Sequence, residues 1–140
     1  MKKFEFLEFA TADVCFKAYG KTLEDVFANA ALAMFDVMLE TDNVKPIIVK
    51  NIDVKGEDLE SLMFEWLNEL LFYVDSGSLG FSRFDVHIDE NQMKLSAKVS
   101  GEPIDQARHR TKTDIKACTY HGMEIKQING IWAAQVILDV

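Results

Sequence analysis

Two aspartates lie at the ends of apolar segments, where packing alone does not explain a charged side chain. Asp13 opens one such segment, and Asp139 ends another, one residue before Val140. A carboxylate in this setting must be solvated, paired or bound to a cation. Hard divalent ions prefer oxygen ligands. Asp13, Asp139 and the Val140 carboxylate could therefore form a metal site if the fold brings them together, and two exposed strand ends are the alternative.

A basic cluster is the second candidate for chemistry. Arg108, His109, Arg110 and Lys112 lie close together in a chain that is otherwise acidic, and a strand-like segment containing Lys116 follows them. One interpretation is a solvated loop that leads into an edge strand. The other is a loop that faces an anion or a protein partner and is supported by a rigid strand.

Composition limits the classes of function. The chain has 140 residues, which predicts one domain spanning residues 1–140. Its formal net charge is −8, so broad electrostatic binding of nucleic acid is not expected. The same charge favours a basic protein partner or a hard cation.

The sequence lacks the usual signatures of catalysis and of membrane insertion. It contains no Ser-His-Asp, Cys-His, H-E-x-x-H or phosphate-loop pattern, which argues against an enzyme. Cys15 and Cys118 lie in apolar runs without metal-ligand spacing and are expected to be buried free thiols. No apolar run is long enough to span a bilayer, and we expect a cytoplasmic protein.

Two amphipathic helices must help to position these residues. Thr22 and Asp58 are predicted N-caps, and the apolar positions after them repeat with a spacing of 36 residues. A glycine precedes each cap, so we infer two copies of a strand–helix unit, with chance similarity as the alternative. The helices are expected to pack through their matched stripes, with Trp66 and Leu67 buried. The second helix carries extra aromatic residues and is expected to be the more deeply buried of the two.

Short alternating segments predict the strands, and Asn129-Gly130 predicts a tight hairpin. The fold class is therefore α+β, with two amphipathic helices packed on mostly antiparallel sheet. The predicted strands span residues 2–8, 14–19, 47–54, 84–88, 93–99, 114–120 and 123–128, with a last strand that ends at residue 140.

Several motifs together resemble the archease family over nearly the whole chain. They are Thr11-Ala12-Asp13, Ala18-Tyr19-Gly20-Lys21-Thr22-Leu23-Glu24, Asp58-Leu59-Glu60-Ser61-Leu62, Trp66-Leu67-Asn68-Glu69-Leu70-Leu71, Arg108-His109, Lys112-Thr113, Ile115-Lys116-Ala117, Thr119-Tyr120-His121-Gly122 and Val136-Ile137-Leu138-Asp139. The chain departs from the family at one point. Phe9-Ala10 stands where the family usually has an acidic residue and a histidine, so any role of that histidine is absent or moved here.

The resemblance implies an accessory role in tRNA splicing and RNA repair. Proteins of this family promote guanylylation and repeated turnover of an RtcB-type RNA ligase and do not join RNA themselves. By the same resemblance, Asp13 and Asp139 would bind a divalent metal ion (calcium, or manganese or magnesium), and Lys116 and His109 would lie near them. Two alternatives remain: a chaperone or modulator of RNA methyltransferases, and a small metal-dependent hydrolase.

Overall fold

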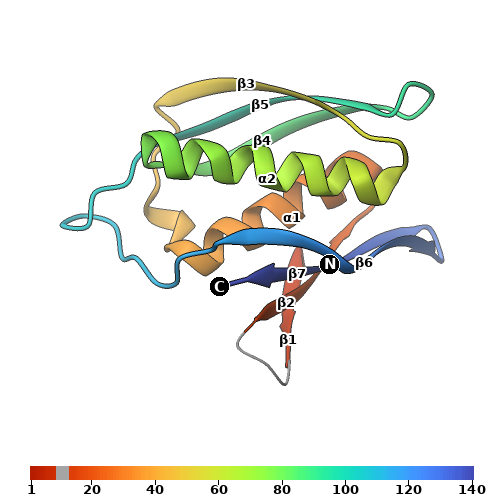
Figure 1. Cartoon of the computed structure of the whole chain (residues 1–140), viewed down its shortest axis with the longest axis horizontal. Helices are drawn as coiled ribbons and strands as arrows, with labels where there is room; N and C mark the ends of the chain where they lie inside the picture. Colours follow the sequence, from red (N-terminus) through yellow and green to blue (C-terminus); the bar gives the residue numbers. More distant parts are fainter. Residues whose placement is uncertain (9–12) are drawn as a thin grey trace.

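Two antiparallel β-sheets enclose two α-helices in the computed structural model, which describes residues 1–8 and 13–140 (Figure 1). This arrangement confirms the predicted α+β class. The elements are β1 (Phe4–Leu7), β2 (Val14–Gly20), α1 (Leu23–Met38), the short 3-10 helix η1 (Thr41–Asn43), β3 (Ile48–Lys55), α2 (Leu59–Gly77), β4 (Leu79–Asp89), β5 (Lys94–Pro103), β6 (Ala117–Ile128) and β7 (Ile131–Asp139). No helix among the described residues is long and apolar enough to cross a membrane.

The two sheets are built from related strand–helix–strand–strand units. The unit β3-α2-β4-β5 forms a sheet with the order β3-β5-β4. The unit β2-α1-β6-β7 forms the order β2-β7-β6, with β1 added beside β2. The unit β3-α2-β4-β5 is therefore inserted into the unit β2-α1-β6-β7, between α1 and β6. This shared topology supports the inferred duplication of a strand–helix unit. It also shows that each unit includes two further strands.

The starts of the two helices have equivalent geometry. Thr22 accepts a hydrogen bond from the Asp25 N–H at 3.1 Å, and Asp58 accepts one from the Ser61 N–H at 2.8 Å. These side chains satisfy backbone donors that have no partner within the helix. A Cβ atom at Gly56 would lie 2.6 Å from the backbone nitrogen of Leu62, so the chain approaches the helix too closely there for any larger residue.

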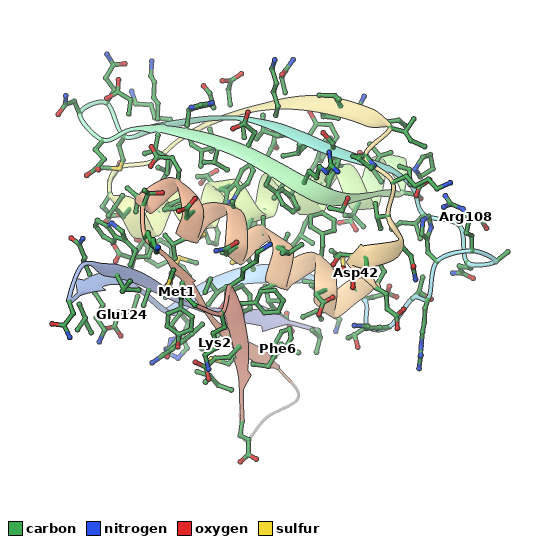
Figure 2. All side chains as sticks on the ribbon, turned by 180° about the vertical axis from the view of Figure 1, so that it is seen from behind. Met1, Lys2, Phe6, Asp42, Arg108 and Glu124 are labelled. Atoms are coloured by element: carbon green, nitrogen blue, oxygen red, sulfur yellow. The ribbon has the colours of Figure 1, made fainter. Side chains whose placement is uncertain are left out.

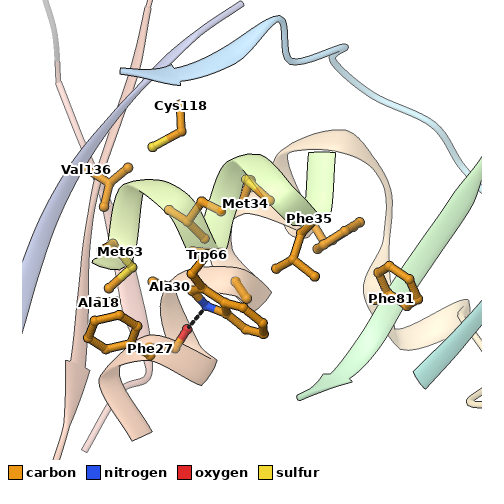
Figure 3. Packing of buried hydrophobic residues seen from close by; sticks show 14 of the residues in the cluster. Ala18, Phe27, Ala30, Met34, Phe35, Met63, Trp66, Phe81, Cys118 and Val136 are labelled. Carbon is orange, nitrogen blue, oxygen red and sulfur yellow. Dashed lines mark hydrogen bonds between the residues drawn. The ribbon is translucent and has the colours of Figure 1, made fainter. Parts of the chain in front are cut away.

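The core lies between the sheets, and both helices contribute to it. Trp66 and Leu67 are fully buried, as predicted. The Trp66 indole N–H donates to the Phe27 carbonyl at 3.0 Å and so links α2 to α1 (Figure 3). Each helix also packs extensively on strands, α1 on β2 and β4 and α2 on β6. The matched apolar stripes of α1 and α2 therefore pack into one core between the sheets. Each helix packs mainly on strands, and the contact between the two helices is only a small part of its packing.

The expectation that the second helix is more deeply buried is wrong. Ten of the 16 residues of α1 are buried, against six of the 19 in α2. Both helices contact strands of both sheets, but α1 packs on them more extensively, and α2 leaves one side open, where Glu65, Phe72 and Asp75 are exposed. Of the additional aromatic residues on α2, Phe72 is exposed and Phe64 and Tyr73 are half-buried.

The predicted strands 114–120 and 123–128 are a single strand, β6, with an irregular register between Thr119 and Glu124. Gly122 has a φ of +70° at this irregularity, which lets the strand continue past it. Residues 114–116 precede the strand and are not part of it. The Asn129-Gly130 hairpin is confirmed, with both residues in the left-handed region. Phe9-Ala10 and Thr11-Ala12 lie outside the described residues.

Candidate functional site

Asp13 and Asp139 lie at the ends of neighbouring strands. Val14, the first residue of β2, pairs with Leu138 of β7 in antiparallel register. If this register continued by one residue beyond Val14, Asp13 would stand opposite Asp139, a position at which Cβ atoms of an antiparallel pair are about 5 Å apart. Val136 and Leu138 fill the core, so alternation along the strand places Asp139 on the outer face of the sheet. Both aspartates are half-buried.

Lys116 and Val140 adjoin these carboxylates. The Lys116 N–H donates to the Asp139 carbonyl at 2.8 Å, and Ala117 pairs with Asp139 in the β6–β7 register. The Lys116 side chain is exposed, and Val140 is half-buried. The fold therefore places Lys116 beside Asp139 and Val140 at the end of β7, and Asp13 directly precedes β2, the strand that pairs with β7.

The donor set fits a hard cation. Two carboxylates from adjacent strands present oxygen ligands, which calcium, magnesium and manganese favour. In the described part of the chain, no group of three or more His, Cys, Asp or Glu side chains is placed to hold a metal ion. A complete ligand shell would therefore need main-chain or terminal oxygens, such as the Val140 carboxylate, beside Asp13 and Asp139.

His109 is engaged in a different cluster. It is 2% exposed, its Nδ1 accepts a hydrogen bond from the Asp105 N–H at 2.8 Å, and its Nε2 lies 3.1 Å from Glu102. Since Nδ1 accepts, the proton of a neutral imidazole is on Nε2 and is donated to Glu102. Both ring nitrogens are thus used within the chain. Sequence analysis placed His109 near the aspartates only through the family resemblance.

Glu102 is the centre of this buried cluster. Arg108 donates to one carboxylate oxygen, and the Lys45 N–H donates to the other at 2.6 Å. The hydrogen bond from Arg108, followed by that from Lys45, lowers the pKa of Glu102 to about 2, against the opposing effect of burial. Sequence analysis did not identify Glu102. In the sequence, Gly101-Glu102-Pro103 indicated only the end of a strand, and the partners of Glu102 are not local.

The basic loop binds to the chain itself. Its backbone caps the end of α1: the Lys112 N–H donates to the Met38 carbonyl at 2.8 Å, and the Thr113 N–H donates to the Val37 carbonyl at 3.2 Å. The Lys112 ammonium also donates to the Asp36 carbonyl at 2.9 Å, where a cation complements the helix dipole. Arg110 lies 3.6 Å from Glu40. Figure 2 shows Arg108 and Asp42 toward the same end of the molecule. The basic cluster therefore anchors this loop to the end of α1.

The two cysteines are poor nucleophiles. Both are buried and free, as predicted. Burial raises the pKa of Cys118 to about 12 and also raises the pKa of Cys15. The thiolate form is therefore disfavoured at both positions.

Comparison with known proteins identifies the family. The model of the archease protein family (MTH1598/TM1083) matches residues 4–140. The chain belongs to the archease family. The protein named archease from Methanothermobacter thermautotrophicus is 44% identical over 142 residues, and that from Sulfurisphaera tokodaii is 41% identical over 140 residues. Each comparison covers 100% of both chains.

Solved structures of archease proteins share this fold. The solution structure of Methanobacterium thermoautotrophicum protein 1598 matches with a TM-score of 0.88 and 44% identity over 100% of both chains. The crystal structure of a Thermotoga maritima archease, described as a possible chaperone, matches with a TM-score of 0.66. It covers 93% of this chain and 92% of that one at 17% identity, so this second likeness concerns the archease fold alone.

Proposed function

We propose that this archease is an accessory protein of an RtcB-type RNA ligase and that it promotes guanylylation of the ligase through a divalent metal site at Asp13 and Asp139. The observation that carries the proposal is the antiparallel pairing of Val14 with Leu138, because Asp13 and Asp139 each lie one residue beyond this pair at the same end of the sheet. Family membership supports the accessory role, and the position of Lys116 beside Asp139 supports an anionic ligand.

The residues of this chain would act by binding and positioning. Asp13, Asp139 and the Val140 carboxylate would hold the ion, which supplies positive charge to stabilise and orient phosphate oxygens. The exposed Lys116 ammonium adds a second positive charge at the same end of the sheet. The hydrogen bond from its backbone N–H to the Asp139 carbonyl holds the Lys116 backbone beside the end of β7. GTP carries a strongly anionic triphosphate, so both features favour its approach to an otherwise acidic protein.

The ligase would supply the attacking histidine. In this chain the two thiols are buried with raised pKa values, and His109 is bonded through both ring nitrogens. These groups are therefore not arranged for nucleophilic attack, which suits an activator rather than a ligase.

The test is the guanylylation rate of a purified RtcB-type ligase from the same organism, measured with GTP and manganese. Wild-type protein should increase this rate, and Asp13→Asn and Asp139→Asn should each abolish the increase while leaving the circular dichroism spectrum unchanged. Lys116→Ala should weaken it. Asp53→Asn is the matched control, because Asp53 is an exposed carboxylate on the other sheet.

Two outcomes would contradict parts of the proposal. Full stimulation by both aspartate variants would exclude the metal mechanism while leaving the partnership with the ligase intact. An unchanged rate with wild-type protein, over a range of GTP and metal concentrations, would exclude the ligase function. Recovery of an RNA methyltransferase from native lysate would then favour the modulator role, and turnover of a phosphoester by the isolated protein would favour a hydrolase.

A further inference from the structure

The open side of α2 carries aromatic and acidic side chains together. Phe64, Glu65, Glu69, Phe72 and Asp75 fall within an arc of roughly 140° on a helical projection. Phe72 is 59% exposed. Tyr120 of β6, which is 48% exposed, packs on Phe64 with ring centroids 5.6 Å apart. We refer to these six residues as the α2–β6 surface.

This surface is rigidly supported. The Asn68 side chain bonds to both the N–H and the carbonyl of Cys118, at 3.1 and 3.3 Å. The Tyr120 hydroxyl donates to Asp58 at 3.4 Å. Figure 1 shows α2 and β6 side by side on the same face of the molecule. Helix and strand therefore present their exposed aromatic side chains in a fixed arrangement.

The charge of the surface has a single sign. The sequence of α2 contains Glu60, Glu65, Glu69 and Asp75 and no lysine or arginine. Within residues 1–8 and 13–140, none of Glu65, Glu69 and Asp75 forms an ion pair. Apolar aromatic area beside unpaired carboxylates is complementary to a cationic segment that also carries apolar side chains.

The surface extends to the chain segment that directly precedes Lys116. Asn68 lies against Cys118, and a hollow is lined by Asp75 of α2 together with Asp114 and Ile115. The helix and the chain leading into β6 therefore run in opposite directions, and Asp75 lies near the residues that directly precede Lys116. In Figure 1 the C-terminal end of α2, the start of β6 and the C-terminus lie toward the same side.

We propose that the α2–β6 surface is a docking site for a cationic, partly apolar segment of a partner protein. The identity of the partner rests on the proposed function, in which it is the ligase. Docking at the α2–β6 surface would then present Lys116 and Asp139 to the nucleotide site of the ligase. Lysine or arginine side chains of the segment would pair with Glu65, Glu69 and Asp75 and stack on Phe72 and Tyr120. Its apolar side chains would cover the rings.

The first experiment does not depend on the ligase. A synthetic amphipathic peptide of lysine and leucine is titrated into the isotopically labelled protein, and amide chemical shifts are followed by NMR. Residues of the α2–β6 surface should shift, and affinity should fall as salt is raised. Phe72→Ser and the double variant Glu65→Lys with Asp75→Lys should each weaken binding about tenfold or more.

Matched control variants test whether lost peptide binding is specific to the α2–β6 surface or follows from any change in exposed apolar area or net charge. Ile47→Ser removes a side chain that is 67% exposed, away from this surface. The double variant Asp42→Lys with Glu90→Lys changes the net charge by the same amount at two exposed positions. Both controls should bind the peptide like wild type. Shifts confined to another face, or surface variants that bind as well as the controls, would overturn the inference.

The second experiment measures binding and guanylylation of the ligase with the same variants. Stimulation lost in the surface variants and kept in the controls supports docking there. Wild-type stimulation retained by the surface variants overturns the docking inference and leaves the proposed function standing. If wild type does not stimulate the ligase but binds the peptide at this surface, the proposed function fails and the cationic docking site stands. A dimer of this chain that Phe72→Ser dissolves would show that a second copy occupies the surface instead.

Discussion

Asn68 on α2 makes two hydrogen bonds to the backbone of Cys118 on β6, which is the edge strand of the four-stranded sheet. One amide side chain thus satisfies both backbone groups that the strand exposes at this residue. Such contacts cover an edge that would otherwise be open to pairing with another chain. The same two hydrogen bonds hold α2 against β6 and so position the aromatic residues of the α2–β6 surface.

Replacing Asn68 by alanine should lower the free energy of unfolding by about 1–3 kcal/mol, because a backbone donor and acceptor lose their partner. Urea unfolding monitored by fluorescence measures this change. Asn91→Ala, in the exposed β4–β5 turn, is the control and should remain within about 0.5 kcal/mol of wild type. Equal effects of the two substitutions would mean that the Asn68 bonds contribute no net stability.

The Glu102 cluster predicts an acid-dependent loss of stability. The pKa of Glu102 is lowered in the folded protein from an ordinary 4.5 to about 2, first by Arg108 and then by the Lys45 N–H. A lowered folded-state pKa stabilises the protein above the unfolded-state pKa, and this contribution is lost as pH falls from about 4.5 to about 2.

Urea midpoints measured between these two pH values should therefore fall more steeply for wild type than for Glu102→Gln, whose side chain does not titrate. Glu90→Gln, an exposed residue of the β4–β5 turn, should keep the wild-type slope. Parallel profiles for wild type and Glu102→Gln would show that Glu102 does not titrate with a depressed pKa.

Leu67→Ala should reduce the free energy of unfolding by about 2–5 kcal/mol, because Leu67 is fully buried and its truncation leaves a cavity. Ile128→Ala removes comparable apolar area at a residue that is 54% exposed and should cost far less. Urea melts of both variants give the comparison. A change below about 0.5 kcal/mol for Leu67→Ala would contradict its burial.

Metal binding at the aspartates should raise thermal stability. An ion that binds the folded chain shifts the unfolding equilibrium in proportion to its free concentration relative to the dissociation constant. Calcium or manganese should therefore raise Tm for wild type and for Asp53→Asn, and chelator should reverse the rise. Asp13→Asn and Asp139→Asn should show no rise. A metal-dependent Tm that persists in both variants would place the ion elsewhere.

Close approach at Gly56 predicts that Gly56→Ala destabilises the protein by about 1–3 kcal/mol, since the added methyl group meets the backbone of α2. Gly20→Ala should behave similarly, because its Cβ would lie 2.5 Å from the Val26 nitrogen. Gly77→Ala is the control. Its nearest neighbour would be 3.7 Å away, and alanine favours a helix, so stability should hold or rise. Thermal unfolding of the three variants tests the predicted order.

The sequence by itself determined the local structure. Thr22 and Asp58 capped the helices because their side chains bond to backbone three residues ahead, and Asn129-Gly130 formed the hairpin because both residues accept positive φ. Helical spacing identified the buried stripe that includes Trp66 and Leu67. These signals act over a few residues, so they survive in the folded protein.

Only the tertiary structure decided the long-range relationships. The β2–β7 pairing put Asp13 and Asp139 at the same end of the sheet, and the partners of His109 and Glu102 came together through the turn at one end of β5. The relative burial of α1 and α2 depended on how extensively each helix packs on the strands of the two sheets. Strand pairing and burial bring together residues that are far apart in the chain. The same residue type can therefore occur in several different tertiary environments. For that reason His109 could be read as a site residue from the sequence, while the fold uses it to bind Glu102.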